Sequence, residues 1–315
     1  MNYCYPLTGE PLEIGRNQSL YDIRGELAFE NYEGSYDFVV DAPSQKERTH
    51  YDSKYAEGGW TSKESLDVID YHDLWEDEPG SREYFKSLGD LMGKKVLLIG
   101  NGTSVKEFLF VRLGAQVTFT DLSFQGVLYA KRRYQASQLG IERPNNCEFH
   151  AVNAYYLPFG DNTFDVICAD AVIHHLGDLE ALFAGIHRCL RPGGVCRFAD
   201  TGYSSFWQGT KKGFLRPLQK YIHKKYGISP EDQKATERGG YTRGELEHLK
   251  TAIGFKSVYY KRVAFFDYML WRMRYRLDAR WVFVFRPAIR WLDSMLAKTP
   301  LMEAQGIALV FGFDK

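Results

Sequence analysis

The sequence has few cysteines and no long hydrophobic run. Its five cysteines are odd in number and scattered, with no Cys-X-X-Cys pair, which excludes a disulfide framework or a cysteine-based zinc site and favours a reducing compartment. No apolar run approaches the roughly 18 residues that a transmembrane helix needs. The first residues also lack the basic and apolar regions of a signal peptide. We therefore expect a cytoplasmic protein that binds no metal.

The chain also lacks an excess of charge of either sign. Its 315 residues carry 40 Lys and Arg against 40 Asp and Glu, so composition gives no general attraction to nucleic acid or membranes. The charges are unevenly placed, however, because residues 1–90 hold 20 acidic and 8 basic side chains. Basic residues gather with aromatic ones in 206–226 and 261–298. The two halves of the chain either pair with each other within the monomer or leave an anion-binding surface.

From about residue 81 the chain alternates buried strands with helices. Apolar runs predict seven strands, at 95–100, 117–121, 147–152, 164–169, 195–200, 256–263 and 306–313. Helices are expected at about 82–92, 105–114, 123–139, 178–190 and 241–255. This alternation is typical of an α/β fold with a doubly wound, Rossmann-like, mostly parallel sheet of seven strands and helices on both faces. The roughly 40 residues before the last strand predict a helical insertion.

The chain divides into four regions. Residues 1–80 have weak periodicity and are interpreted as an irregular N-terminal extension, followed by the ligand-binding core at 81–201. Residues 202–240 are interpreted as a substrate lid, and 241–315 as the end of the sheet with the helical insertion at about 264–305. The opening CYPLTGEPL resembles a degenerate zinc ribbon that has kept only Cys4 of its ligands. We expect it to cap the ligand cleft.

A glycine-rich turn follows the first strand of the core. Gly100 and Gly102, on either side of Asn101, would let the backbone approach a ligand closely and point helix N–H groups at it. About twenty residues later the second strand ends in Asp121, a carboxylate that can accept both hydroxyl protons of a ribose. Ligands of such sheets bind at the carboxyl ends of the strands, so the two features together indicate a nucleoside-containing cofactor.

Four segments resemble motifs of the class I S-adenosylmethionine (SAM) dependent methyltransferases, in the same order and spacing: VLLIGNGTS, TFTD, NAYYLPFGDNTFDVICADAVIHHLGD and IHRCLRPGGVCRFAD. The chain is most similar to the ubiquinone/menaquinone methyltransferase-like group, over about residues 90–201. The resemblance implies SAM as the cofactor. It assigns the methionine part of SAM to Gly100, Asn101 and Gly102, the ribose to Asp121, the adenine to Leu122, Asn153 and Ala154, and the surroundings of the reactive methyl to Ala169 and Asp170.

Three positions depart from the pattern of that family. Leu98 stands where an acidic residue is usual, Ser104 replaces the third glycine and Asn153 replaces an aspartate. The amide oxygen of Asn153 still accepts a hydrogen bond from an adenine N–H. Because Leu98 supplies no carboxylate, another group would have to contact the methionine ammonium end of SAM, and Tyr51 and Tyr55 are candidates. The alternative is a degenerate scaffold that binds no cofactor.

Methyl transfer is an in-line displacement, so the protein mainly aligns the acceptor with the methyl group. A general base is needed only when the acceptor must lose a proton, and Asp170, His174 and His175 are the candidates. In the resembling family the His-His-Leu turn is largely structural, so packing and capping stand as alternative roles for the histidines. Asp170 is better placed by topology, with orientation of SAM or substrate as its alternative role.

The acceptor depends on the two insertions, which mix bulky aromatic residues with Arg and Lys. We expect an O, N or C nucleophile on a small-molecule metabolite, aromatic or apolar, with the basic residues able to pair with a phosphate or carboxylate. A lipid or quinone reached by peripheral membrane contact through 264–298 is one alternative. RNA is another, although the neutral net charge and the acidic first 90 residues count against nucleic acid. The oligomeric state is left open.

Overall fold

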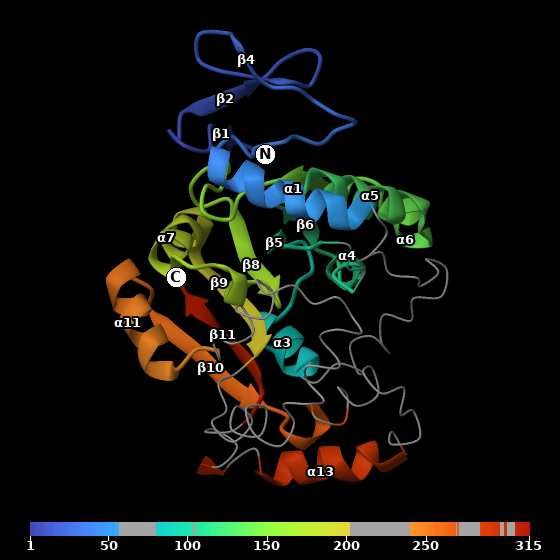
Figure 1. Ribbon diagram of the computed structural model, residues 1–315, viewed down its shortest axis with the longest axis vertical. Helices are drawn as coiled ribbons and strands as arrows, with labels where there is room; N and C mark the ends of the chain where they lie inside the picture. The colour runs from blue at the N-terminus through green and yellow to red at the C-terminus, as the bar shows by residue number, and fades with distance from the viewer. Residues whose placement is uncertain are drawn as a thin grey trace.

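The structure is a computed structural model that describes residues 1–56, 80–102, 104, 106–201, 240–268, 270, 284–296, 299–300 and 306–315. A seven-stranded sheet with helices on both faces forms its centre, and a small four-stranded sheet lies at one end (Figure 1). The predicted α/β fold is therefore confirmed. The predicted lid at 202–240 lies outside the described residues except for Gly240.

The central sheet has the order β10-β11-β9-β8-β5-β6-β7. Its strands are β5 (Lys95–Ile99), β6 (Gln116–Asp121), β7 (Cys147–Ala151), β8 (Phe164–Asp170), β9 (Leu190–Thr201), β10 (Ser257–Val263) and β11 (Ala308–Asp314). Strands β5 to β9 are parallel, and β11 is antiparallel to both of its neighbours. Strand β5 lies between β6 and β8, so the order reverses there and the carboxyl ends of these strands form the switch point.

The strand β5 shows why the sheet is buried on both faces. Its side chains Val96 and Leu98 join one hydrophobic cluster, and Leu97 and Ile99 join another. The first cluster is covered by α3 (Ser81–Leu88), α4 (Phe108–Arg112), α5 (Phe124–Ala136) and α6 (Gln138–Glu142), and the second by α7 (Leu179–Cys189) and α11 (Arg243–Ile253). A strand covered on both faces reads as one continuous apolar run, which is why it was predictable.

Three predicted helices differ from the structure in length. The helix expected at about 82–92 is α3, which ends at Leu88 because Gly89 follows with a φ of +72°. The helix expected at 105–114 is shortened to α4, because Lys106 and Glu107 form a turn before it begins. The helix expected at 123–139 is divided at Ser137, which has extended backbone angles (φ −82°, ψ 155°). Its hydroxyl accepts a hydrogen bond from the backbone N–H of Gly140 and so begins α6.

The N-terminal region is not irregular, so that prediction was wrong for its described part. The antiparallel strands β1 (Tyr3–Cys4), β2 (Pro11–Ile14), β3 (Leu20–Tyr21) and β4 (Leu27–Phe29) precede a helix, α1 (Ala42–Ala56). Strands of two to four residues are too short to show a period of two. Between β4 and α1, the backbone oxygen of Tyr36 accepts the N–H of Ala151 at 3.0 Å, and the N–H of Phe38 donates to the backbone oxygen of Ala151 at 2.9 Å. This pairing extends the central sheet beyond β7.

A buried histidine attaches the N-terminal strands to β7. His150 accepts a hydrogen bond at Nδ1 from the backbone N–H of Tyr36 at 3.2 Å, and its Nε2 lies 3.1 Å from the hydroxyl of Tyr3. The Tyr3 hydroxyl also donates to Glu148 at 3.1 Å. Burial lowers the pKa of His150, although Glu148 raises it. A neutral imidazole therefore holds this junction together.

The predicted helical insertion is confirmed where it is described. The helix α13 (Arg286–Leu296) lies between β10 and β11, at the end of the molecule opposite the small sheet (Figure 1). The WRMRYRL segment at 271–277 falls outside the described residues. Within the ranges given above, no helix combines the length and the apolar character needed to cross a membrane.

Candidate cofactor and catalytic site

The glycine turn at the end of β5 has little space for side chains. Gly100 and Gly102 have φ values of +70° and +55°, which side chains rarely adopt. A Cβ at Gly100 would lie 2.5 Å from a methyl carbon of Val172, and one at Gly102 would lie 2.9 Å from the hydroxyl of Tyr55. The two glycines therefore form a half-buried turn, hereafter the cradle, in which backbone and not side chain faces Val172 and Tyr55 at the switch point. Their contact with a ligand stays a prediction.

The carboxylate of Asp121 connects this cradle to the end of β6. One of its oxygens accepts the backbone N–H of Gly102 at 2.7 Å, and the other accepts that of Ser123 at 2.9 Å. Burial raises the pKa of Asp121, the nearby charge of Asp52 raises it further, and the backbone hydrogen bonds oppose both effects. Each carboxylate oxygen has two lone pairs, so both can still accept a hydroxyl group of a ribose.

The side chain of Asn101 supplies a polar atom beside the cradle. Asn101 is 7% exposed, and its amide nitrogen donates to the backbone oxygen of Gly102 at 3.3 Å. Its amide oxygen is buried and has no hydrogen-bond partner among the residues that the structure describes. An unpartnered buried oxygen at this position suits a ligand that donates a hydrogen bond, such as an ammonium group. The cradle therefore fits the methionine end of SAM.

The helix α1 passes over the carboxyl edge of the sheet. Near its first turn, the amide nitrogen of Asn153 donates to Ser44 at 2.7 Å and to Asp41 at 3.1 Å. The amide oxygen of Asn153 accepts the backbone N–H of Tyr155 at 2.9 Å. The side-chain amide of Asn153 thus connects the sheet to the start of α1. Its oxygen keeps one lone pair that can accept a further hydrogen bond. Its contact with adenine stays a prediction.

At the other end of α1, Tyr55 reaches the cradle. A Cβ at Gly126 would lie 2.7 Å from its ring, so the ring packs closely on the start of α5 as well as on Gly102. Burial and the charge of Asp121 raise the pKa of Tyr55, so the phenol stays protonated and can donate. Tyr51 lies one turn earlier, and its ring packs edge-on against His50 at 5.5 Å. Of the two candidates, the structure brings Tyr55 to the cradle.

The position of Leu98 is apolar in the structure as well as in the sequence. Leu98 is 2% exposed within the hydrophobic cluster, and its backbone oxygen accepts the hydroxyl of Thr120 at 2.7 Å. The parallel pairing of Leu98 with Cys168 brings the end of β8 level with the cradle. There Asp170 forms an ion pair with Lys106. A carboxylate therefore does lie beside the cradle, although it comes from the neighbouring strand.

His174 contacts a carboxylate that the sequence did not reveal. Its Nδ1 lies 2.8 Å from one oxygen of Asp200, at the end of β9, and its backbone N–H donates to the other at 3.1 Å. The side chain of Asp200 is 1% exposed and that of His174 is 13% exposed. The two groups are close but not aligned as a hydrogen bond, because Nδ1 has no partner in hydrogen-bond geometry among the described residues. A rotation of the ring that aligned Nδ1 with the carboxylate would leave Nε2 to exchange a proton. Of the three predicted bases, His174 has the geometry best suited to that role.

The turn that carries both histidines is fixed from two sides. The hydroxyl of Tyr241 donates to the backbone oxygen of Ile173 at 2.8 Å, and that of Tyr155 accepts the N–H of Gly177 at 2.7 Å. The rings of His174 and His175 are 4.1 Å apart between centroids. His175 therefore packs against the candidate base, and a catalytic role of its own stays a prediction.

The remaining predicted contacts lie at the edges of the two hydrophobic clusters. Leu122 and Ala154 are partly buried there, and Ala169 is 2% exposed. Ala169 and Asp170 end β8 next to the cradle, as predicted. Asp200 and Lys106 were missed, although an acidic residue at the end of a predicted strand and a basic residue after a glycine turn were visible signals.

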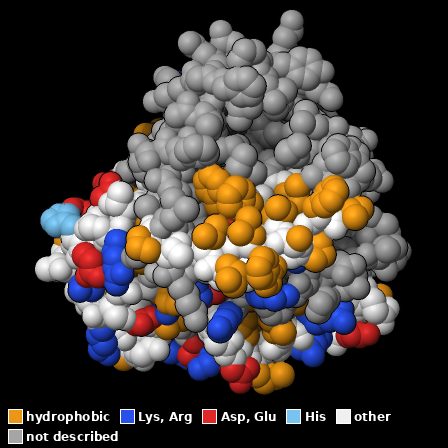
Figure 2. Space-filling view, turned by 90° about the horizontal axis from the view of Figure 1, so that it is seen from below, with side chains coloured by type: hydrophobic (Ala, Val, Ile, Leu, Met, Phe, Trp, Pro, Cys, Tyr) orange, Lys and Arg blue, Asp and Glu red, His pale blue; other side chains and the backbone are white. Residues whose placement is uncertain are grey.

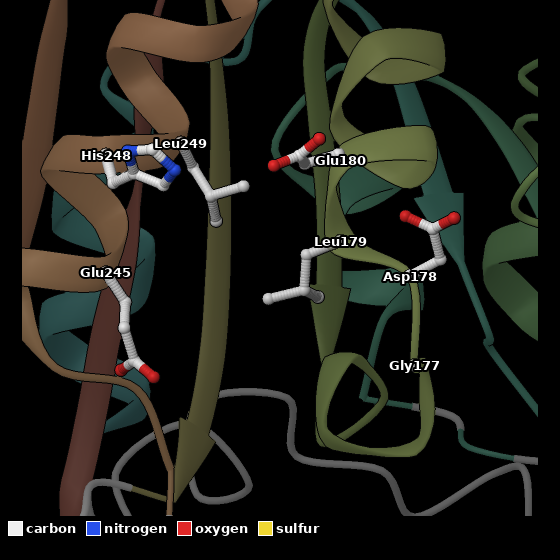
Figure 3. Close-up of a pocket in the computed structure, with 7 residues that line it drawn as sticks. All are labelled: Gly177, Asp178, Leu179, Glu180, Glu245, His248 and Leu249. Carbon is white, nitrogen blue, oxygen red and sulfur yellow. The ribbon is translucent and has the colours of Figure 1, made fainter.

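A groove of about 500 Å³ lies between α7 and α11, lined by Gly177, Asp178, Leu179, Glu180, Glu245, His248 and Leu249 (Figure 3). Two of its carboxylates cap the helices, because Asp178 accepts the N–H of Ala181 and Glu245 forms a capping box with Thr242. None of the predicted cofactor contacts lines it. The groove is therefore separate from the cradle.

Part of the chain resembles known methyltransferases. A family model described as a methyltransferase domain matches residues 97–198. The ubiquinone/menaquinone biosynthesis C-methyltransferase UbiE of Cellvibrio japonicus is 31% identical over 134 residues, which cover 39% of this chain and 47% of that protein. A ubiquinone biosynthesis O-methyltransferase of Rhizobium leguminosarum is 31% identical over 110 residues, which cover 35% of this chain and 41% of that protein. The chain thus spans less than half the length of these two relatives.

Solved structures share the fold. A phosphoethanolamine N-methyltransferase 2 of Haemonchus contortus, in complex with SAM, has a TM-score of 0.52 at 16% identity, and the match covers 88% of this chain and 61% of that one. A geranyl diphosphate methyltransferase in complex with GPP and sinefungin has a TM-score of 0.51 at 15% identity, with coverage of 87% and 99%. Together the comparisons show that residues 97–198 match a methyltransferase domain and that the chain shares its fold with methyltransferases that bind SAM.

Proposed function

We propose that this chain transfers the methyl group of SAM to an O, N or C nucleophile of a small, apolar or aromatic metabolite. One observation carries the proposal. The carboxyl edge of the sheet brings the glycine cradle and Asp121 together with an imidazole, His174, that lies 2.8 Å from the carboxylate of Asp200 and whose backbone N–H donates to that carboxylate. The first pair suits a nucleoside cofactor, and the second suits an acceptor that must lose a proton.

The cofactor would be held by the residues of the cradle. The backbone at Gly100 and Gly102 and the amide oxygen of Asn101 would contact the methionine part, and Asp121 would accept from the ribose hydroxyl groups. When bound, SAM supplies a methyl group already activated on a sulfonium. The helix α1, with Tyr55 at its end, covers this side and excludes water from it.

The chain's own residues would then handle the proton of the acceptor. His174 accepts that proton at Nε2, and Asp200 stabilises the imidazolium that forms. Asp170, held in an ion pair by Lys106, remains an anionic group that orients the ligands beside the cradle. The curated relatives named as C- and O-methyltransferases of quinone biosynthesis support an apolar small-molecule acceptor.

The test is a transfer assay with SAM that carries a labelled methyl group. The purified chain is incubated separately with the small-molecule, lipid and RNA fractions of a cell extract, alongside an Asp121→Ala variant as the control without a ribose contact. We expect label in the small-molecule fraction with the wild type and none with the variant. Label only in lipid or only in RNA would replace the acceptor class. No label in any fraction, although S-adenosylhomocysteine binds, would favour a catalytically inactive scaffold that has kept its cofactor site.

A further inference from the structure

The imidazole of His150 is enclosed where the N-terminal region meets β7. It is 1% exposed, and the rings of Tyr3, Tyr36 and Phe38 surround it with centroids 5.3 to 5.8 Å away. These four residues and Glu148 are hereafter the N-terminal junction. At the opposite end of the molecule, where α13 lies, hydrophobic side chains instead gather on the surface (Figure 2). The junction therefore holds a titratable ring inside a closed aromatic cage.

Hydrogen bonds at the junction determine which nitrogen of the ring carries the proton. Nδ1 of His150 accepts the backbone N–H of Tyr36 at 3.2 Å, so the proton of the neutral ring lies on Nε2. Nε2 then donates to the hydroxyl oxygen of Tyr3 at 3.1 Å, and that hydroxyl donates to Glu148 at 3.1 Å. Donors and acceptors therefore alternate without a gap from the backbone of Tyr36 to the carboxylate of Glu148.

A second proton on the ring breaks this order. It has to enter at Nδ1, where it meets the N–H of Tyr36, and two donors 3.2 Å apart form no hydrogen bond. The charged ring would also lie buried among aromatic side chains. Of the charged groups that face it, Glu148 favours the imidazolium, whereas Lys131 and the N-terminal amine oppose it. Burial outweighs Glu148, and the pKa of His150 is lowered.

The residues held at the junction lead directly to the cofactor site. Asp37 lies between the two residues that pair with Ala151, and its carboxylate forms an ion pair with Arg48 of α1 at 2.6 Å. Ala151 itself lies opposite Asp121 in the pairing of β6 with β7. The helix α1, which follows this segment, carries Tyr55 to the cradle (Figure 1). The junction, α1 and the ribose carboxylate are thus neighbours in one short chain of contacts.

The helix α1 depends on this anchor because it buries little of its own surface. None of its side chains that the structure describes is buried, whereas the neighbouring α5 buries seven residues. The side chains of Arg48 and Asp37 are 21% and 33% exposed, and ion pairs so close to solvent contribute little to stability. Loss of the pairing at Ala151 would therefore free α1 from the edge of the sheet.

We propose that protonation of His150 opens the N-terminal junction, which releases residues 36–38 from β7 and α1 from the cofactor site. In the released chain the pKa of the imidazole returns to its ordinary value of about 6.5. Each pH unit below that value therefore raises the released fraction up to about tenfold, until the lowered native pKa is reached. The consequence for the cofactor rests on the proposed function, whereas the release itself needs no ligand.

The test of the release is hydrogen exchange of the ligand-free chain between pH 6.5 and 5, corrected for the intrinsic effect of pH. The N–H groups of Phe38 and Ala151 donate across the junction and report on its opening, and those of β5 report on global unfolding. We expect exchange at the junction to accelerate about tenfold over this range and not to respond to dilute urea, because the opening is local. The same urea dependence at the junction and in β5 would overturn the proposal.

Three variants test the part played by His150. In His150→Gln the acceleration should disappear, whatever the absolute rate, because the side chain cannot gain a charge. In Glu148→Gln it should increase, because the anion that favours the imidazolium in the closed junction is gone. Glu148 is 44% exposed, and exposed Glu142 on α6 gives the matched control Glu142→Gln. Acceleration that persists in His150→Gln, or that decreases in Glu148→Gln, would contradict the proposal.

Calorimetric titration of S-adenosylhomocysteine tests the link to the cofactor site. Between pH 6.5 and 5, the affinity of the wild type should fall about threefold or more beyond the fall in His150→Gln, in which Asp121 still titrates. An equal fall in the two proteins would overturn the link. No binding at any pH, together with the expected exchange, would support the opening of the junction and contradict the proposed function.

Discussion

Replacing Asp200 with asparagine should slow methyl transfer without weakening cofactor binding. In the wild type the carboxylate contacts Nδ1 of His174 at 2.8 Å and accepts its backbone N–H at 3.1 Å. Asparagine keeps the size of the side chain and one acceptor oxygen. Its amide group, however, can donate to Nδ1, which favours the imidazole tautomer with the proton on Nε2. That tautomer cannot accept a proton from the substrate at Nε2.

The magnitude follows from what a positioned base contributes. General base catalysis is worth about 100- to 10,000-fold in rate, so Asp200→Asn should lose about 100-fold or more, roughly 3 kcal/mol in the barrier. His174→Gln removes the base itself and should lose at least as much. His175→Gln should stay within a few-fold of the wild type, because that ring packs beside the imidazole of His174.

The assay is the rate at which label enters the small-molecule product at saturating SAM. Calorimetric titration of S-adenosylhomocysteine into each variant is the control, because none of the three side chains belongs to the cradle. A rate for Asp200→Asn close to that of the wild type would refute the role of His174 as a base. Loss of S-adenosylhomocysteine affinity in parallel with the rate would show that the pair supports the cofactor site instead.

Three further predictions concern the cradle, the N-terminal junction and the insertion. Gly100→Ala should weaken S-adenosylhomocysteine binding about tenfold or more, because the new Cβ meets Val172 at 2.5 Å, and Val172→Ala in the same chain should restore part of the affinity measured by calorimetry. The free energy of unfolding, measured in urea, should fall as the pH drops below about 6.5. The pKa of His150 is lowered in the native state, so the unfolded chain binds the proton more readily. A His150→Gln variant should show a shallower dependence of the free energy of unfolding on pH in that range. Asp267→Asn should cost about 3 kcal/mol of stability by the same urea measurement, because Arg286 and Arg290 then lose a shared buried carboxylate, and an unchanged midpoint would contradict this.

The core of the fold was predictable because its central strands are covered on both faces. Such strands leave continuous apolar runs in the sequence, as 95–100 does, and the turns between them carry glycine. The pairing of Gly102 with Asp121 was equally accessible, since both stand at strand ends that a parallel sheet must bring together. The helix α1 was missed because its residues are mostly polar and show no apolar period, and its place is set by contacts with Asn153 and the cradle.

Other parts of the site depend on contacts between distant residues. The sequence shows an acidic residue at position 200 but not that β9 brings it to His174, because that contact depends on the register of β8 and β9. The ion pair of Lys106 with Asp170 also joins residues more than 60 positions apart, and the sequence does not show that contact. For α13, periodicity indicates two faces, yet only the buried partner Asp267 determines that the charged face turns inward.

Calorimetric titration of S-adenosylhomocysteine into the wild type and into Asp121→Ala tests the cofactor site most directly. Asp121 accepts from Gly102 and Ser123 and has lone pairs left for the ribose. We expect micromolar binding to the wild type and a loss of about 100-fold or more in the variant, because charge-assisted hydrogen bonds are worth about 1.5–3 kcal/mol each. Binding to the wild type should also weaken in acid, since the raised pKa of Asp121 brings its protonation closer to neutral pH. Equal affinity in the two proteins, or none in the wild type, would contradict a SAM site at this edge of the sheet.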